Sequence, residues 1–162
     1  MVWIIIIVLL VGADQLLKQL VMSALTGPST ITVIDNFFFI VHRRNTGAAW
    51  SFLADASWGI IVLSILSGVA SLVLLVLTLR LKKARYQAAL ALMTAGAIGN
   101  LIDRVRYGSV TDYLDFHFGS YIFPTFNLAD MCLVCGTILL SWFVLREPDQ
   151  NKKVGSGQTF LS

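Results

Sequence analysis

Residues 58–79, WGIIVLSILSGVASLVLLVLTL, form a run of 22 residues without a single charge. A helix needs roughly 17–25 residues to cross the hydrocarbon core of a bilayer, so this run predicts a transmembrane helix. The rest of the chain agrees: 57% of its 162 residues are hydrophobic, 13% are charged, and the mean hydropathy is +0.79. A soluble domain is nearer 45–50% apolar and about 25% charged. Most of the surface of this protein is therefore expected to face lipid.

Three further apolar windows of similar length lie at residues 3–22, 86–102 and 126–145. The first of them resembles a cleavable signal sequence in its position, but it lacks a basic start and carries Asp14 and Lys18 where a signal sequence is apolar. Together with the uncharged run above, these windows predict an all-α membrane protein with four transmembrane helices.

The four helices are expected to form one domain, residues 1–146, followed by a flexible tail, residues 147–162. An even number of spans places both chain ends on the same side of the membrane. That side carries most of the clustered basic residues, which are Arg80, Lys82, Lys83, Arg85, Arg146, Lys152 and Lys153. By the positive-inside rule both termini are cytoplasmic. The net charge of +3 is scattered, so nucleic acid is not expected as a partner.

The two segments between helices on the other side, residues 23–57 and 103–125, then face outward. Residues 30–34 and 37–41 are rich in β-branched and aromatic side chains, which is typical of short strands. We therefore predict a small extramembrane sheet within about residues 30–52. The second outward segment is interrupted by glycines and is expected to lie on the membrane surface rather than to form a separate domain.

Several polar residues occur inside the predicted spans, where an ionisable group is costly and so marks a candidate functional site. Asp14 and Lys18 stand four residues apart and share a helix face, so they could neutralise each other and orient the first helix. Asn100, Asp103 and Arg104 end the third helix. The two charged residues could mark the membrane boundary, whereas a buried asparagine amide needs hydrogen-bond partners.

Asp130 lies near the start of the fourth predicted helix, three residues after Asn127, so both side chains project to the same side. A capping role would account for a carboxylate at this position. Asp112, in the outward segment, could be an ordinary solvated acid. If the fold joins the two carboxyls, one stays protonated and the other acts as a base, as in aspartic proteases. Such a pair activates water without a metal or a covalent intermediate.

Other chemistries find less support in the sequence. Metal binding needs clustered ligands, and the two histidines, His42 and His117, lie in separate loops where both are expected at the surface. A Ser-His-Asp arrangement stays open by spacing, although the chain has no G-x-S-x-G elbow. Cys132 and Cys135 form a C-x-x-C within an apolar helix, where free cysteines behave as small hydrophobic residues. We expect no metal and no cofactor.

Five stretches of the chain together carry a family likeness. They are Asp14-Gln15-x-x-Lys18, NTGAAWS at residues 45–51, GAIGNLIDR at residues 96–104, GSVTDY at residues 108–113 and FNLAD at residues 126–130. In this order they resemble the motifs of the lipoprotein signal peptidases, also called signal peptidase II. The likeness covers nearly all of the chain up to about residue 146.

The resemblance implies a four-helix bundle with a small outward-facing β-cradle, in the bacterial cytoplasmic (inner) membrane, with its active site at the outer face. It implies an aspartic endopeptidase that removes signal peptides from diacylglyceryl-modified prolipoproteins by cleaving before the lipidated cysteine. The expected partners are these substrates and membrane lipid, with no obligate protein partner. The second to fourth helices would supply an apolar groove, and residues 37–51 would close over the substrate.

The resemblance also assigns residues. The catalytic aspartates are Asp112 and Asp130, and Asp115 is excluded because the aspartate of the motif follows Val110 by two positions. Residues that bind substrate or support the pair are expected to be Asn45, Gly47, Asn100, Arg104 and Asn127. Structural polar residues are expected to be Asp14, Lys18 and Asp103. Thr111 departs from the family, in which an aliphatic residue is common at this position.

Two other classes of function stay open at this point. A small proton-coupled exporter needs only four helices and one intramembrane acid, although such an acid belongs nearer mid-bilayer than Asp130. A thiol oxidoreductase would use Cys132 and Cys135, and it would lose its function if both were replaced by serine.

Overall fold

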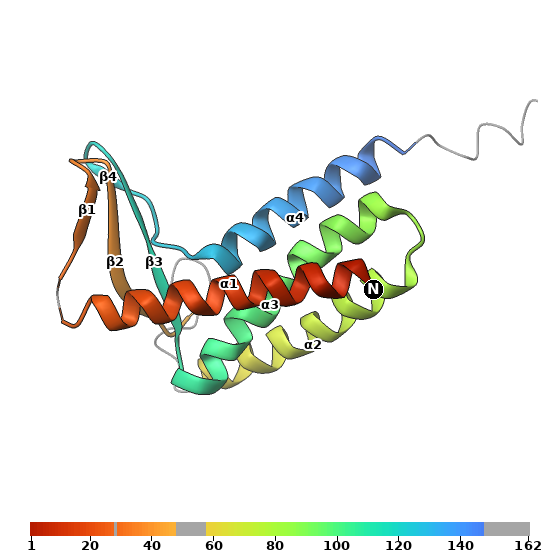
Figure 1. Ribbon diagram of the computed structural model, residues 1–162, viewed down its shortest axis with the longest axis horizontal. Coiled ribbons are helices and arrows are strands. Elements are labelled where there is room, and N and C mark those ends of the chain that lie inside the picture. The colour runs from red at the N-terminus through yellow and green to blue at the C-terminus, as the bar shows by residue number, and fades with distance from the viewer. Residues whose placement is uncertain (28, 48–57, 148–162) are drawn as a thin grey trace, which may run out of the picture.

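The structure is a computed structural model that describes residues 1–27, 29–47 and 58–147. Within these ranges, four helices are long and apolar enough to cross a membrane: α1 (Val2–Ala24), α2 (Gly59–Arg80), α3 (Ala84–Tyr107) and α4 (Leu128–Leu145). The predicted four-helix membrane architecture is confirmed. The predicted tail lies, apart from Glu147, outside the described residues. The N-terminus and the last turn of α4 lie at the same end of the bundle (Figure 1).

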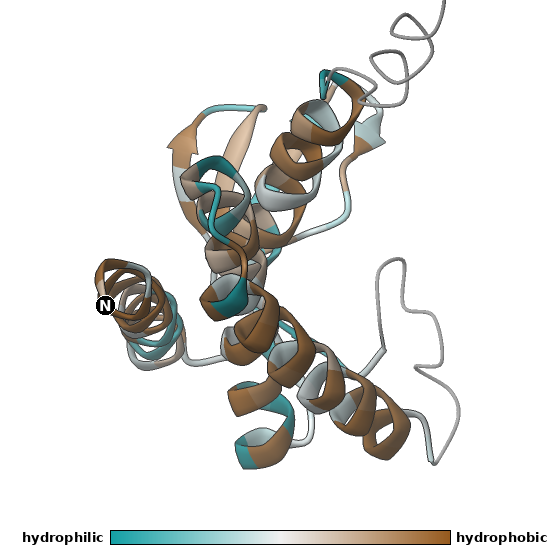
Figure 2. Ribbon diagram, turned by 90° about the vertical axis from the view of Figure 1, so that its right-hand side faces the viewer, coloured by the Kyte–Doolittle hydropathy of each residue, from teal (hydrophilic) through white to brown (hydrophobic). Residues whose placement is uncertain are grey.

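The helix α3 is the centre of the bundle. It packs against each of the other three helices, whereas α1 and α4 touch at only a few positions. In the 18-residue apolar window of α3, 56% of the window is buried, whereas in that of α2 only 6% is buried. Most residues of α2 and α4 are apolar, as the brown ribbons of Figure 2 show, and many of their large apolar side chains are exposed. Lipid is therefore the natural solvent for the outer helices, while α3 is shielded by protein.

Two glycines allow the backbones of α3 and α4 to approach closely. A Cβ at Gly96 would lie 2.3 Å from the carbonyl oxygen of Ala129, and a Cβ at Gly136 would lie 2.7 Å from that of Ala89. Membrane helices gain little from hydrophobic burial against one another, so close van der Waals packing at small residues holds them together. These contacts fix where the start of α4 lies on α3.

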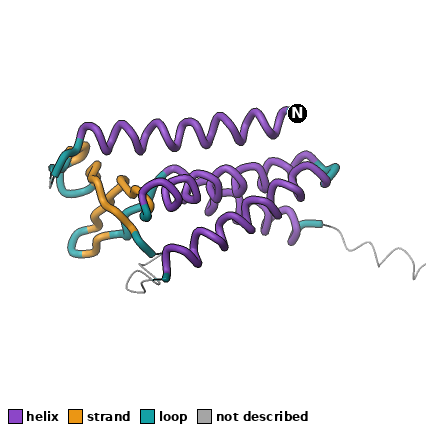
Figure 3. Tube along the Cα trace, turned by 90° about the horizontal axis from the view of Figure 1, so that it is seen from below, coloured by secondary structure: helices purple, strands orange, loops and turns teal. Residues whose placement is uncertain are grey.

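A four-stranded antiparallel sheet stands at the end of the bundle away from the N-terminus (Figure 3). Its strands follow the chain order and are β1 (Ile31–Ile34), β2 (Phe38–Asn45), β3 (Val110–Phe118) and β4 (Tyr121–Ile122). The predicted extramembrane sheet is thus present. The last residues of the predicted β-segment, 48–52, lie outside the described part of the chain.

No strand was predicted within residues 103–125, but the structure has two there, and they belong to the sheet rather than to a separate domain. The helix α3 extends to Tyr107, where Gly108 adopts a left-handed φ of 65° and ends it. Residues 110–122 then form half of the sheet, and Asp112 stands opposite Arg43 of β2. Asp112 and Asp115 interrupt the β-forming residues of β3, which masked the strand pattern in the sequence.

Polar contacts also close the opposite end of the bundle. Lys83 and Tyr86, at the start of α3, both hydrogen-bond the Glu147 carboxylate just after α4. In addition, the indole N–H of Trp3 donates to the side-chain oxygen of Gln87 at 2.9 Å. These contacts lie at the other end of the helices from the sheet.

We expect Gly96→Ala to lower the unfolding midpoint of the detergent-purified protein by several degrees. The added Cβ meets the Ala129 carbonyl, and overpacking of this kind costs about 1–3 kcal/mol. Gly12→Ala, in α1, is the matched control, because a Cβ there has no neighbouring atom within 4 Å. Alanine is also the better helix former, so Gly12→Ala should be neutral or stabilising. Equal midpoints for the two variants would contradict the packing argument.

Candidate active site

The helix α4 begins in a buried turn whose first three backbone N–H groups all find a partner. Such groups have no acceptor inside their own helix and are costly when left unpaired in protein or lipid. The three partners come from β3, from α1 and from the N-cap of α4: Leu128 N donates to Tyr113 Oη at 3.3 Å, Ala129 N to Asp14 Oδ1 at 3.0 Å, and Asp130 N to Asn127 Oδ1 at 2.9 Å.

The carboxylate of Asp130 is held on both of its oxygens. Its Oδ2 accepts from the Asn127 backbone N at 3.3 Å, which completes a capping box at the start of α4. Its Oδ1 accepts from Asn100 Nδ2 of α3 at 2.7 Å. The capping interpretation therefore describes one oxygen of Asp130, and the other oxygen points to α3.

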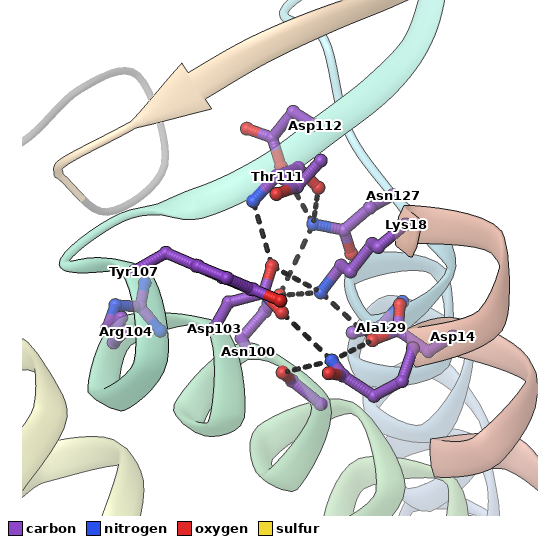
Figure 4. Close-up of polar contacts among 12 residues, drawn as sticks. Asp14, Lys18, Asn100, Asp103, Arg104, Tyr107, Thr111, Asp112, Asn127 and Ala129 are labelled. Atoms are coloured by element: carbon purple, nitrogen blue, oxygen red, sulfur yellow. Dashed lines mark hydrogen bonds and ion pairs between the residues drawn. The ribbon is translucent and has the colours of Figure 1, made fainter. Parts of the chain in front are cut away.

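Asp112, in β3, lies next to the same cap. Its Oδ1 accepts from Asn127 Nδ2 at 2.7 Å and its Oδ2 from Asn45 Nδ2 of β2 at 3.1 Å. Asn127 therefore contacts both acids, since its amide oxygen binds the backbone of Asp130 and its amide nitrogen binds Asp112. Asp112 is only 3% exposed. The fold thus brings Asp112, Asp130, Asn45, Asn100 and Asn127 into one polar cluster. Figure 4 shows Asp112, Asn127 and Asn100 of this cluster.

A second cluster, of charged residues, lies beside the first one and links α1 to α3. Lys18 Nζ lies 2.9 Å from Asp14 Oδ2 and 3.2 Å from Asp103 Oδ2, and all three residues are 1% exposed. Asp103 Oδ2 also accepts from the backbone N of Thr111 at 2.9 Å, one residue before Asp112. The three residues predicted to be structural therefore contact each other, α4 and β3.

Gln15 and Gly99 also take part, and sequence reasoning gave them no role. Gln15 Nε2 donates to Asp103 Oδ1 at 2.9 Å and to the carbonyl oxygen of Gly99 at 3.2 Å. A Cβ at Gly99 would lie 2.6 Å from Asp14 Oδ2, so only glycine leaves room for this carboxylate. Both residues stand within the quoted motifs, which was the only available signal for them.

Arg104 is placed between the sheet and α2. Its Nη1 donates to Ser67 Oγ at 3.2 Å and its Nη2 to the carbonyl oxygen of Gly47 at 3.4 Å, while Gly47 N donates to Asn45 Oδ1 at 2.9 Å. The positive charge of Arg104 interacts electrostatically with both Asp112 and Asp130. Gly47 and Arg104 thus adjoin the pair of acids. The expected closure of residues 37–51 involves positions 48–51, which lie outside the described residues.

Asp115 belongs to a different set of contacts on the sheet. Its carboxylate lies 2.9 Å from His117 Nε2, 3.1 Å from Thr125 Oγ1 and 3.6 Å from Arg43 Nη2. The expectation that both histidines are surface loop residues is wrong. His117 lies in β3 and is paired with Asp115, while His42 lies in β2 with its Nε2 buried.

Burial changes the chemistry of the two titratable groups of β3 that face α4. Burial raises the pKa of Asp112 to about 6, and the negative charge of Asp130 adds to this shift. The hydrogen bonds from Asn45 and Asn127 and the charge of Lys18 act in the opposite direction. Burial also raises the pKa of Tyr113 to about 12, so its hydroxyl stays protonated. Asp112 therefore keeps its proton to a higher pH than an ordinary aspartic acid does.

Metal and thiol chemistry find no further support in the geometry. The described residues contain no group of three or more His, Cys, Asp or Glu side chains that could hold a metal ion. Cys132 and Cys135 are free thiols, with Cys132 buried and Cys135 exposed. The two thiols thus lie in different environments.

Comparisons with solved structures give the same architecture. Two bacterial membrane enzymes, determined by the in meso method at 2.3 Å and 1.9 Å, each superpose with a TM-score of 0.79. The first is 29% identical and the match covers 99% of this chain and 94% of the solved one. The second is 33% identical, with 91% and 94% covered.

Comparisons with sequences name the family. The chain is 43% identical to the lipoprotein signal peptidase of Geobacter sulfurreducens, with 83% of this chain and 85% of the relative covered. The lipoprotein signal peptidases of Clostridioides difficile and Xanthomonas euvesicatoria are 40% and 37% identical, over 90% and 97% of this chain and 95% and 93% of theirs. The family model described as "Signal peptidase (SPase) II" matches residues 6–146. The chain therefore belongs to the signal peptidase II family of bacterial membrane proteases.

Proposed function

We propose that this protein is an aspartic endopeptidase in which Asp112 and Asp130 share one proton and cleave prolipoproteins before a lipidated cysteine. The observation that carries the proposal is the single asparagine, Asn127, that hydrogen-bonds Asp112 through its side chain and Asp130 through its backbone and side chain. Two buried carboxyls in one hydrogen-bonded cluster do not both ionise readily. Such a pair supplies an acid and a base at the same pH.

The surroundings of the two acids differ, and this difference assigns their roles. Asp130 stands in the first turn of α4, where the helix dipole and the Asn127 backbone N–H favour a negative charge. Asp112 lies in a strand, next to the N-cap of α4 but outside its first turn. We therefore assign the proton to Asp112 and the resting negative charge to Asp130.

The reaction follows from these roles. Asp130 takes a proton from a water molecule, whose oxygen attacks the scissile carbonyl carbon. Asp112 donates its proton to the carbonyl oxygen, which gives a neutral tetrahedral diol. The C–N bond then breaks as Asp130 passes its proton to the leaving nitrogen and a diol hydroxyl returns its proton to Asp112. The pair ends in its starting state, so no other proton donor is needed.

The substrate is expected to reach this site from the membrane. The polar cluster is formed by residues of α3, the start of α4 and the sheet, and many large apolar side chains of α2 and α4 are exposed. A precursor with a transmembrane signal helix and acyl chains next to its cleavage point suits such a position. The basic residues of the α2–α3 connection lie at the other end of the bundle, which by the positive-inside rule is cytoplasmic. The sheet and the site then face outward.

We expect Asp112→Asn and Asp130→Asn each to lower the cleavage rate at least about 100-fold, because each removes one of the two proton-transfer groups. The assay follows release of the signal peptide from a diacylglyceryl-modified precursor by the purified protein in detergent. An unlipidated precursor serves as the substrate control.

The double variant Cys132→Ser/Cys135→Ser is the matched control, since both thiols lie on α4 and have no part in the proposed reaction. It should retain activity. Wild-type rates in either asparagine variant would refute the aspartate pair, and an inactive cysteine variant that still folds would favour thiol chemistry. Thermal unfolding of all variants separates loss of chemistry from loss of fold.

We also expect kcat/KM to fall as the pH rises above about 6. At that pH the proton leaves Asp112, whose pKa is raised to about 6, and the pair loses its acid. The pH dependence of kcat/KM reports the free enzyme, so the alkaline limb of the profile should lie near this value. A kcat/KM that stays constant from pH 5 to about pH 9 would show that Asp112 does not act as the acid.

A further inference from the structure

We propose that Lys18 is a positioning residue that sets the protonation of the Asp112/Asp130 pair through Asn100, beyond its part in holding α1. The inference rests on the proposed function, because it concerns the same two acids. Lys18 lies on α1, whereas the acids lie on β3 and α4, and Asn100 of α3 contacts both Lys18 and Asp130. Figure 4 shows Lys18 and Asn100 side by side, below Asp112.

The ammonium of Lys18 has three oxygen partners, one for each of its protons. They are Asp14 Oδ2 at 2.9 Å, Asn100 Oδ1 at 3.1 Å and Asp103 Oδ2 at 3.2 Å. The side chain is 1% exposed, so water cannot replace any of these partners. A simple neutralising pair on α1 would need only Asp14. The contact with Asn100 links the ammonium group to the acids, because Asn100 also donates a hydrogen bond to Asp130.

Lys18 fixes which way the amide of Asn100 faces. An ammonium group can only donate hydrogen bonds, so the Asn100 oxygen must face Lys18. The same oxygen accepts from Asn127 Nδ2 at 3.3 Å. The Asn100 nitrogen must then face Asp130, whose Oδ1 it reaches at 2.7 Å. Without the ammonium, a rotated Asn100 could present its oxygen to Asp130 instead, which would repel a carboxylate.

Lys18 also supplies buried positive charge next to an excess of acids. The acids around the site are Asp14 on α1, Asp103 on α3, Asp112 on β3 and Asp130 on α4, and the cations that interact with the pair are Lys18 and Arg104. Arg104 is only partly buried, whereas Lys18 is fully buried, where charges interact more strongly. The charge of Lys18 opposes the rise in the pKa of Asp112. The negative charge of Asp14 interacts electrostatically with Asp130, so on the pair of acids it acts with the opposite sign to Lys18.

The test measures the alkaline limb of the kcat/KM profile in a set of charge variants. Lys18→Met removes a positive charge and makes the shared proton harder to lose, so the limb should move up by about one pH unit. Asp14→Asn removes a negative charge and should move the limb down. It keeps a side-chain oxygen for the Ala129 N–H. In the double variant the two shifts should largely cancel.

Lys83→Met is the matched control, because Lys83 binds Glu147 at the opposite end of the bundle and its loss should leave the limb unmoved. If Lys18→Met does not fold, Asp14→Asn decides alone, and a limb that moves down supports the inference. If the alkaline limb of the kcat/KM profile is the same as in the wild type for every folded variant of Lys18 and Asp14, the proposed role of Lys18 is refuted.

The outcomes separate this inference from the proposed function. Activity in Asp112→Asn or Asp130→Asn refutes the aspartate pair itself. If those variants are inactive but the limb does not respond to charge at positions 14 and 18, the pair stands and the role of Lys18 is only structural. A purely structural role would lower the unfolding midpoint of Lys18→Met without changing its pH profile.

Discussion

The buried start of α4 imposes the constraint on which the rest of the structure depends. A helix that begins inside a membrane protein must satisfy its first N–H groups with protein atoms. Here the hydroxyl of Tyr113, the carboxylate of Asp14 and the amide of Asn127 each accept one of them. These three contacts tie α4 to β3 and α1. They hold Asp130 in a fixed orientation beside Asp112.

The same contacts account for the buried charges. Burying an isolated carboxylate in a membrane protein is expensive, and each acid here lies against donors that lower this cost. Asp14 binds Lys18 and the Ala129 N–H, and Asp103 binds Lys18 and the Thr111 N–H. The polar network therefore joins α1, α3, α4 and β3, in addition to the close packing of α3 against α4. The same residues therefore support the fold and, in our proposal, adjust the protonation of the two acids.

The sequence predicted what depends on local pattern. The four helices follow from long apolar windows, and the face shared by Asp14 and Lys18 follows from their spacing of four residues. The strand β3 was missed because Asp112 and Asp115 interrupt its β-forming residues. The contacts of Gln15 with Asp103, and of Asp14 with the Ala129 N–H, join residues far apart in the chain. No periodicity encodes such contacts, so only the family motifs hinted at these positions.

Backbone hydrogen bonds join the sheet to the start of α4. Phe126, just before α4, exchanges backbone hydrogen bonds with Leu114 and also accepts from Tyr113 N, so β3 is joined directly to the start of α4. The two acids therefore lie at the ends of one continuous segment, residues 112–130, whose two ends are held together by these backbone hydrogen bonds. Loop-closure entropy grows only slowly with length, so a segment of this size costs little more to close than a shorter one. Joining Asp112 to Asp130 is thus a contact within one stretch of chain, whereas Asp14, Asn45 and Asn100 reach that stretch from α1, β2 and α3.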